Sequence, residues 1–185
     1  GEKKYFDPGN PAAREYVVDV VRDVVKRYDV DGIHFDDYFY PYKEQGENLN
    51  DYNEFAANPR GFTNIEDWRR DNVNKLVQDV STMIKKFKPF VRFGIGSFGV
   101  WRNSDRDPMN GSDTRSGITS YDDLYADILL WLKNGWIDYV APQIYWSVGY
   151  PPSDYSKLLD WWSKHTYGKH LYVGQAAYKV GTSQN

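Results

Sequence analysis

Two adjacent carboxylates, Asp36 and Asp37, directly follow a short apolar run at residues 33–35. Cleavage of a glycosidic bond needs two carboxyl groups beside the bond, one protonated and the other ionised. An aspartate that follows a strand can equally be a helix cap or a turn residue, so a structural interpretation also stands. We take both as candidate catalytic residues.

Side chains that suit carbohydrate recognition follow this run and three later apolar runs. Amides and a guanidinium can bind sugar hydroxyls, and Trp and Tyr rings can pack on the C–H faces of sugars. The candidate substrate-binding residues are His34, Tyr38, Tyr40, Trp101, Arg102, Asn103, Gln143, Tyr145, Trp146 and Gln175. Taken alone, Tyr145 and Trp146 are more typical of a packed core than of a binding surface.

His34 and Asp36 share one face of the predicted strand because side chains alternate, whereas Asp37 takes the other face. A histidine and a carboxylate on one face can also begin a metal site, which needs further ligands. The other two histidines, His165 and His170, fall on a predicted helix and at the start of a predicted strand. We therefore predict neither a metal nor a cofactor.

The second carboxyl group of a glycosidase is not obvious, because the predicted strand that ends near residue 98 contains no glutamate. The candidates for this group are Asp7, Glu44, Glu47 and Asp105, or a residue outside this chain. Since the carboxyl separation decides between retention and inversion, the sequence leaves the stereochemistry open.

The elements that must position these residues alternate along the chain. Apolar residues at helical spacing predict helices over about 10–28, 66–87 and 120–135, and a fourth that opens at Ser153. Apolar runs predict strands over 33–38, 91–98, 138–146 and 170–178, and residues 5–7 are compatible with the end of another strand. Parallel strands joined by helices are the economical arrangement, and ligands bind at the C-terminal ends of such strands.

Single residues refine this outline. Asn10 predicts the start of the first helix, whose inner face is predicted to carry Val17, Val20, Val21, Val24, Val25 and Tyr28. Gly94 and Gly96 in the second strand predict a close approach by backbone or ligand. Pro142 counts against a regular third strand because it removes a ladder donor. The segment 39–64 reads as a long loop with room for one short helix.

Composition narrows the classes of partner. The chain has 185 residues and a net charge of −3, from 23 Lys and Arg against 26 Asp and Glu, which argues against a nucleic-acid binder. No apolar stretch approaches the roughly 20 residues of a membrane helix, so we predict no transmembrane segment in this chain. Cysteine is absent, which excludes disulfides and thiolate catalysis. Aromatic residues make up 17% of the chain, which can fill a core or line a stacking cleft.

Longer segments of the chain resemble the bacterial glycosyl-hydrolase-like ten family, in order and over nearly the whole length. The resembling segments are residues 7–11, 28–41, 68–74, 99–103, 120–127 and 138–146. The resemblance implies a TIM-barrel glycosidase domain of an exported protein or lipoprotein, and some members act on peptidoglycan glycan strands stripped of peptide. Residues 31–36 are also similar to the strand-four motif of the α-amylase superfamily. That similarity implies a nucleophile at Asp36, although His34 stands where that family has arginine.

A complete TIM barrel has eight strands and typically about 250 residues. Four predicted strands therefore indicate one partial domain over residues 1–185, an α/β fold of parallel β/α units that makes about half of a barrel. Unpaired sheet edges invite pairing, so we expect a homodimer through these edges or an open sheet with irregular loops over it.

The function that we expect is glycoside hydrolysis by the complete protein, with a polysaccharide substrate such as peptidoglycan glycan strands. We expect the complete protein to be extracellular or periplasmic, either free or held by a lipid anchor. Two alternatives remain open. One is a non-catalytic carbohydrate-binding domain, and the other is a metal-dependent hydrolase of sugar esters or amides.

Overall fold

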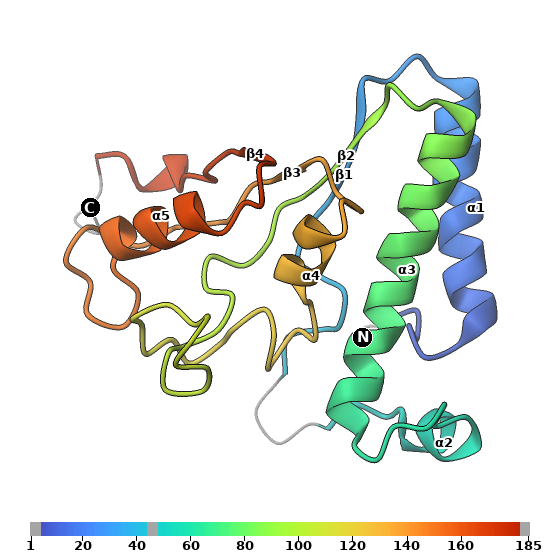
Figure 1. Ribbon diagram of the computed structural model, residues 1–185, viewed down its shortest axis with the longest axis horizontal. Helices are drawn as coiled ribbons and strands as arrows, with labels where there is room; N and C mark the ends of the chain where they lie inside the picture. Colours follow the sequence, from blue (N-terminus) through green and yellow to red (C-terminus); the bar gives the residue numbers. More distant parts are fainter. Residues whose placement is uncertain (1–4, 44–47, 182–185) are drawn as a thin grey trace.

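A computed structural model describes residues 5–43 and 48–181 of the chain, in which helices and strands alternate (Figure 1). The helices are α1 (Pro11–Arg27), α2 (Tyr52–Ala57), α3 (Ile65–Phe87), α4 (Ile128–Lys133) and α5 (Tyr155–Lys164), followed by a 3-10 turn at Ala177–Lys179. The strands are β1 (Gly32–Phe35), β2 (Arg92–Ile95), β3 (Tyr139–Val140) and β4 (His170–Leu171). They form one parallel sheet in the order β1-β2-β3-β4, which confirms the α/β fold of a partial barrel.

The strands are shorter than the apolar runs, but their pairing continues beyond the regular ladder. Gln143 forms single parallel bridges with both Phe98 and Gly174 after the strands have ended. The backbone N–H of Gln143 donates to the backbone carbonyl of Ser97 at 2.9 Å. Pro142 lies in the stretch between β3 and this bridge and lacks a backbone donor, which interrupts the regular ladder there.

The helix α1 begins at its predicted cap, because the side chain of Asn10 accepts a hydrogen bond from the backbone N–H of Ala12 at 2.9 Å. Figure 1 shows α1 and α3 running side by side. The buried valines of α1 are Val18, Val21 and Val25. The prediction that Val20 and Tyr28 are buried is wrong, since they are 46% and 54% exposed. Packing against one neighbouring helix buries a narrower stripe than the valine pattern suggested.

The predicted helix start at Ser120 is also wrong, because α4 begins only at Ile128. The carboxylate of Asp123 accepts hydrogen bonds from the backbone N–H and the hydroxyl of Thr119, which closes a turn in place of a helix. Tyr125 then takes a left-handed φ of 54°, which ends any helical continuation. The helix cap is Asp127, whose side chain accepts from the N–H of Leu130 at 3.2 Å.

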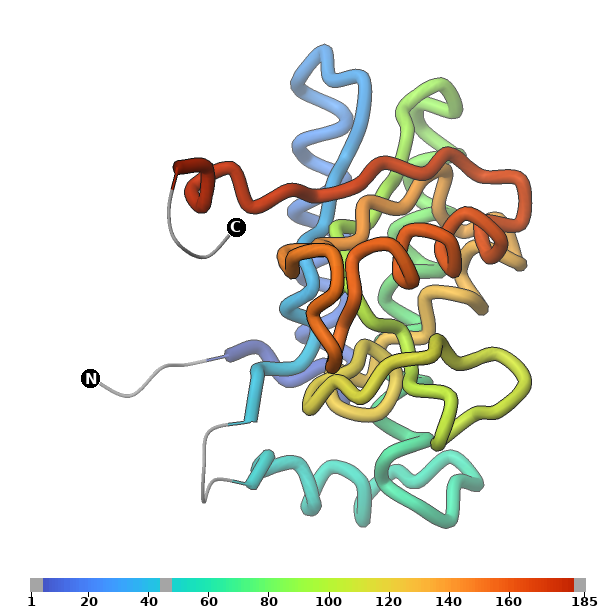
Figure 2. Tube along the Cα trace, turned by 90° about the vertical axis from the view of Figure 1, so that its left-hand side faces the viewer, coloured from blue at the N-terminus to red at the C-terminus, as the bar shows by residue number. Residues whose placement is uncertain are grey.

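Much of the aromatic content fills the core. Trp68, Trp131 and Trp162 are fully buried, and each indole N–H has a partner in the chain. Trp162 donates to the backbone carbonyl of Gly99 at 2.8 Å, which ties α5 to the segment that leaves β2. Residues 5–7 form no strand, contrary to one expectation. Figure 2 shows the segment before α1 and the segment after β4 extending on the same side of the molecule.

Within the described residues, no helix combines the length and the apolar character that a membrane crossing requires.

Candidate active site

Two glycines, Gly94 in β2 and Gly96 just after it, open the site by leaving space over the strand between β1 and β3. Gly94 is paired with His34 on one side and Tyr139 on the other. A Cβ atom on Gly94 would lie 2.0 Å from the ring of Tyr139, and one on Gly96 would lie 2.8 Å from Nε2 of His34. Both glycines are closely approached, as predicted, but the approaching groups are side chains of the two neighbouring strands and not backbone or a ligand.

Asp36 lies at the C-terminal end of β1, and its exposed carboxylate is held from across the sheet. Its Oδ1 accepts a hydrogen bond from Nε2 of Gln143 at 2.7 Å and one from the backbone N–H of Asp37 at 2.9 Å. Nε2 of Gln143 also donates to the backbone carbonyl of Gly96 at 3.0 Å. Both of the hydrogen bonds from Gln143 and from the backbone of Asp37 are accepted by Oδ1.

Asp37 has a different environment, although it is the next residue. It is only 4% exposed, and its carboxylate accepts a hydrogen bond from the hydroxyl of Tyr42. Burial raises the pKa of Asp37; the bond from Tyr42 opposes this rise, and the charge of Asp36 adds to it. Burial, together with the carboxylate of Asp37, also raises the pKa of Tyr42. The two neighbouring carboxyl groups therefore differ in exposure, and burial raises the pKa of the inner one, Asp37.

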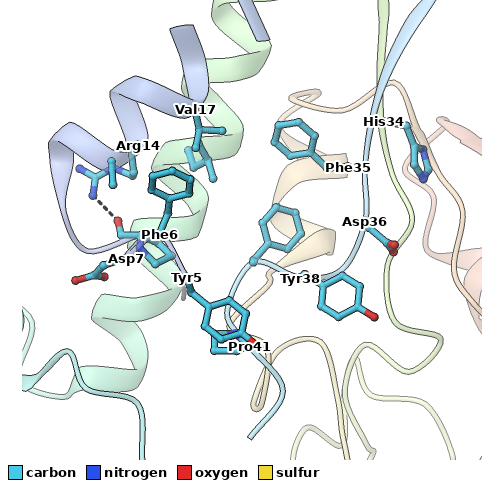
Figure 3. A pocket seen from close by; sticks show the side chains of 14 residues that line it. Tyr5, Phe6, Asp7, Arg14, Val17, His34, Phe35, Asp36, Tyr38 and Pro41 are labelled. Carbon is cyan, nitrogen blue, oxygen red and sulfur yellow. Dashed lines mark hydrogen bonds between the residues drawn. The ribbon is translucent and has the colours of Figure 1, made fainter. Parts of the chain in front are cut away.

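A pocket of about 450 Å³ lies along β1 and includes Asp36 in its wall (Figure 3). Figure 3 shows His34 and Asp36 projecting from β1 to one side and Phe35 projecting to the other. Tyr38 stands next to Asp36, whereas Phe6 lies on the far side of the strand. The pocket is therefore polar at the end of β1 and aromatic towards α1.

The four candidates for a second carboxyl group are placed differently. Asp7 lines the same pocket as Asp36, and burial raises the pKa of its carboxyl against a 2.7 Å hydrogen bond from the N–H of Gly9. Figure 3 places Asp7 at the opposite end of the pocket from Asp36, beyond the aromatic rings. Asp105 is exposed on the loop after β2 and does not line this pocket. Glu44 and Glu47 lie outside the described residues.

Phenol and indole rings extend the site beyond β3. Burial raises the pKa of Tyr145, and the negative charge of Asp36 raises it further, because the phenol and the carboxylate are near neighbours. Trp146 packs edge to face on Phe98, with ring centroids 5.5 Å apart. Trp146, Tyr145 and Gln175 line a smaller cavity of about 170 Å³. Nε2 of Gln175 donates to the hydroxyl of Tyr155 at 2.7 Å.

Eight of the ten predicted sugar contacts do not line the pocket that contains Asp36, and four of these eight, which lie in the loops after β1 and β2, have partners within the chain. Tyr40 and Trp101 are 2% and 5% exposed; Tyr40 accepts from the amide of Asn72, and Trp101 stacks on Trp161. The side-chain oxygen of Asn103 accepts from the backbone N–H of Ser116 and the hydroxyl of Thr114. Arg102 pairs with Asp122 at 3.0 Å and lies over the ring of Tyr121. These four side chains serve the packing of the loops after β1 and β2.

Two residues of the site were absent from the sequence-based set. The hydroxyl of Tyr139 lies 2.9 Å from Nδ1 of His34, and the two rings stack. Its inward direction could have been found, because Tyr139 and Gln143 have the same parity along one strand. The contact of Tyr42 with Asp37 could not be predicted from the sequence, because Tyr42 lies in a loop, where side-chain directions follow no regular period.

In the described part of the chain, no three His, Asp or Glu side chains lie close enough together to hold a metal ion.

Comparisons with known proteins bear on the family of the chain. The family model described as glycosyl hydrolase-like 10 matches residues 1–185. Glycosyl hydrolase YngK of Bacillus subtilis (strain 168) is 50% identical over 186 residues, which cover 99% of this chain and 36% of that protein. Glycosyl hydrolase DigH of Escherichia coli (strain K12) is 44% identical over 184 residues, which cover 98% of this chain and 41% of that protein. The chain thus spans well under half the length of these relatives.

Proposed function

The chain belongs to the glycosyl hydrolase-like 10 family, and from this premise we propose that the complete protein hydrolyses O-glycosidic bonds of a polysaccharide. The observation that carries the proposal is the exposed carboxylate of Asp36, held through one oxygen at the C-terminal end of β1. Ligands of parallel α/β barrels bind at this end of the strands. Glycan strands of peptidoglycan are the substrate that we propose to test first.

Asp36 acts in this proposal as the nucleophile or as the stabiliser of positive charge on the sugar. Two donors hold Oδ1, and Oδ2 is proposed to face the anomeric carbon. Asp37 acts in support, since its backbone N–H is one of those donors and its buried side chain is anchored by Tyr42. The acid that protonates the leaving group is a carboxyl group still to be identified.

The sugar itself is proposed to pack on the rings beside Asp36. Tyr38 is 69% exposed next to Asp36, and Trp146 and Tyr145 border the neighbouring cavity. Flat aromatic faces bind the C–H faces of sugars, while the amide of Gln175 can bind a hydroxyl. His34 lies one layer deeper on the same face of β1 and can contact a sugar that enters the pocket.

The test replaces Asp36 with Asn in the complete protein and measures the release of reducing ends from peptide-free glycan strands and from other polysaccharides. Asp29→Asn is the matched control, because Asp29 is exposed and does not line the pocket. We expect D36N to lose at least about 100-fold in kcat and D29N to retain full activity. Activity of D36N within a few-fold of the unchanged protein would remove Asp36 from the mechanism.

The two alternative functions give different outcomes in the same assay. Glycan binding without release of reducing ends by the unchanged protein would favour a carbohydrate-binding domain. Loss of activity on addition of a chelator would favour a metal-dependent hydrolase.

We also propose that two copies of this chain pair through their sheet edges. In the described residues, β1 and β4 each have one neighbouring strand only. Pairing β1 of each copy with β4 of the other would close eight parallel strands around a two-fold axis.

A further inference from the structure

Gln143 lies where three strands of the sheet come to an end. It bridges Phe98 on one side and Gly174 on the other. Glycines make room for it on both sides: a Cβ atom on Gly99 would lie 2.5 Å from its carbonyl oxygen, and one on Gly174 would lie 3.3 Å from its Cα. The backbone of Gln143 is therefore fixed from two neighbouring strands.

The side chain of Gln143 is fixed as well. An amide NH₂ group offers two donors. Nε2 donates to Oδ1 of Asp36 at 2.7 Å and to the carbonyl oxygen of Gly96 at 3.0 Å, so both donors are used within the chain. Gln143 therefore has only its Oε1 left, which can accept a hydrogen bond from a sugar hydroxyl, and it has no free donor to offer a sugar oxygen.

Asp36 needs such support because of its place in the sheet. It follows Phe35, the last residue of β1, and β1 has a paired strand on one side only in the described chain. The last ladder bond runs from the N–H of Gly96 to the carbonyl of Phe35 at 2.8 Å. Beyond that bond, rotation of the Asp36 carboxylate is opposed by its own backbone neighbour and by Gln143.

We propose that Gln143 is a positioning residue for Asp36 and not a hydrogen-bond donor to the substrate. Through Nε2 it ties the carboxylate to the backbone of β2, so that Oδ1 stays occupied and Oδ2 faces the pocket. The inference rests on the proposed function, since it assigns how the reacting carboxylate of that site is oriented. A carboxylate that is free to rotate spends less time in the reactive geometry, and small misplacements have large effects on rate.

Kinetics of two matched variants separate positioning from binding. Gln143→Met keeps the volume of the side chain and removes both donors, and Gln175→Met makes the same change on the next strand. We expect Q143M to lower kcat by about 100-fold with little change in KM, and Q175M to raise KM with kcat retained. A raised KM with an unchanged kcat in Q143M would overturn the proposal.

A second measurement needs no activity and no folded Gln143 variant. In the 185-residue chain, the side-chain NH₂ signals of Gln143 are assigned by NMR and compared between the unchanged chain, D36N and D29N. We expect both Gln143 signals to shift in D36N and to stay in place in D29N. Unshifted signals in D36N would overturn the positioning role. If the unchanged protein cleaves no glycan, the proposed function fails, while these signals still decide whether Gln143 holds Asp36.

Discussion

Nδ1 of His34 lies 2.9 Å from the hydroxyl of Tyr139, although β2 runs between the strands that carry them. The contact exists because Gly94 and Gly96 have no side chains to fill the space over β2. The same gap lets Gln143 reach Asp36. Because Gly94 in β2 and Gly96 just after it have no side chains, residues of β1 and β3 can contact each other on this face of the sheet.

Replacing Gly96 with Ala is expected to disturb both contacts. The new Cβ atom would lie 2.8 Å from Nε2 of His34 and 3.7 Å from Oδ1 of Asp36, so the imidazole must move. We expect a loss of about 1–3 kcal/mol in the free energy of unfolding, measured with urea, and lower glycan turnover. Gly117→Ala is the control, because a Cβ atom at Gly117 would meet nothing within 4 Å. Equal stability of the two variants would contradict this account of β2.

Trp146 and Trp101 are expected to respond differently to replacement by Ala. Trp101 is 5% exposed in the core, so W101A should lose about 3–5 kcal/mol of stability. Trp146 is partly exposed at the rim of a cavity, so W146A should remain folded and lose about tenfold in glycan affinity. Thermal unfolding and isothermal titration with a glycan oligosaccharide measure the two effects. If W101A remains folded and binds the glycan more weakly, Trp101 is a sugar-binding residue and not a core residue.

Asp37→Asn is expected to change how stability depends on pH. Burial raises the pKa of Asp37 above its ordinary value of 3.8, so the folded chain holds this proton more tightly than the unfolded chain. The resulting stabilisation is complete below the unfolded pKa and is lost as pH rises through the folded one. Asparagine does not ionise, so D37N does not lose stability in this way. The free energy of unfolding of D37N, relative to that of the unchanged chain, should therefore rise from pH 4 towards neutrality. Urea unfolding at several pH values measures this, and a constant difference would refute it.

The mass of the chain in solution tests edge pairing. If β1 and β4 pair between copies, sedimentation equilibrium should give twice the mass of one chain, with dissociation on dilution. The mass of a single chain at every concentration would exclude the dimer. Pairing would also bring the C-terminal end of β1 in one copy, with its Asp36, beside the end of β4 in the other.

Local pattern was sufficient for the outline of the fold. The helix cap at Asn10, the alternation of helices and strands, and the close approach at Gly94 and Gly96 all follow from residue types within a few positions of one another. The position of Asp36 at a strand end is of the same kind. Such features depend on backbone conformation and side-chain periodicity, which neighbouring residues largely determine.

Only the tertiary structure decided which strand-end residues meet. Trp101 and Trp146 look alike in sequence, yet the first stacks on Trp161 in the core and the second borders a cavity. Gln143 suits sugar binding until its two donors are found on Asp36 and Gly96, the first of them 107 residues away. Burial and hydrogen-bond partners depend on segments that folding brings together from distant parts of the chain, and no local pattern contains that information.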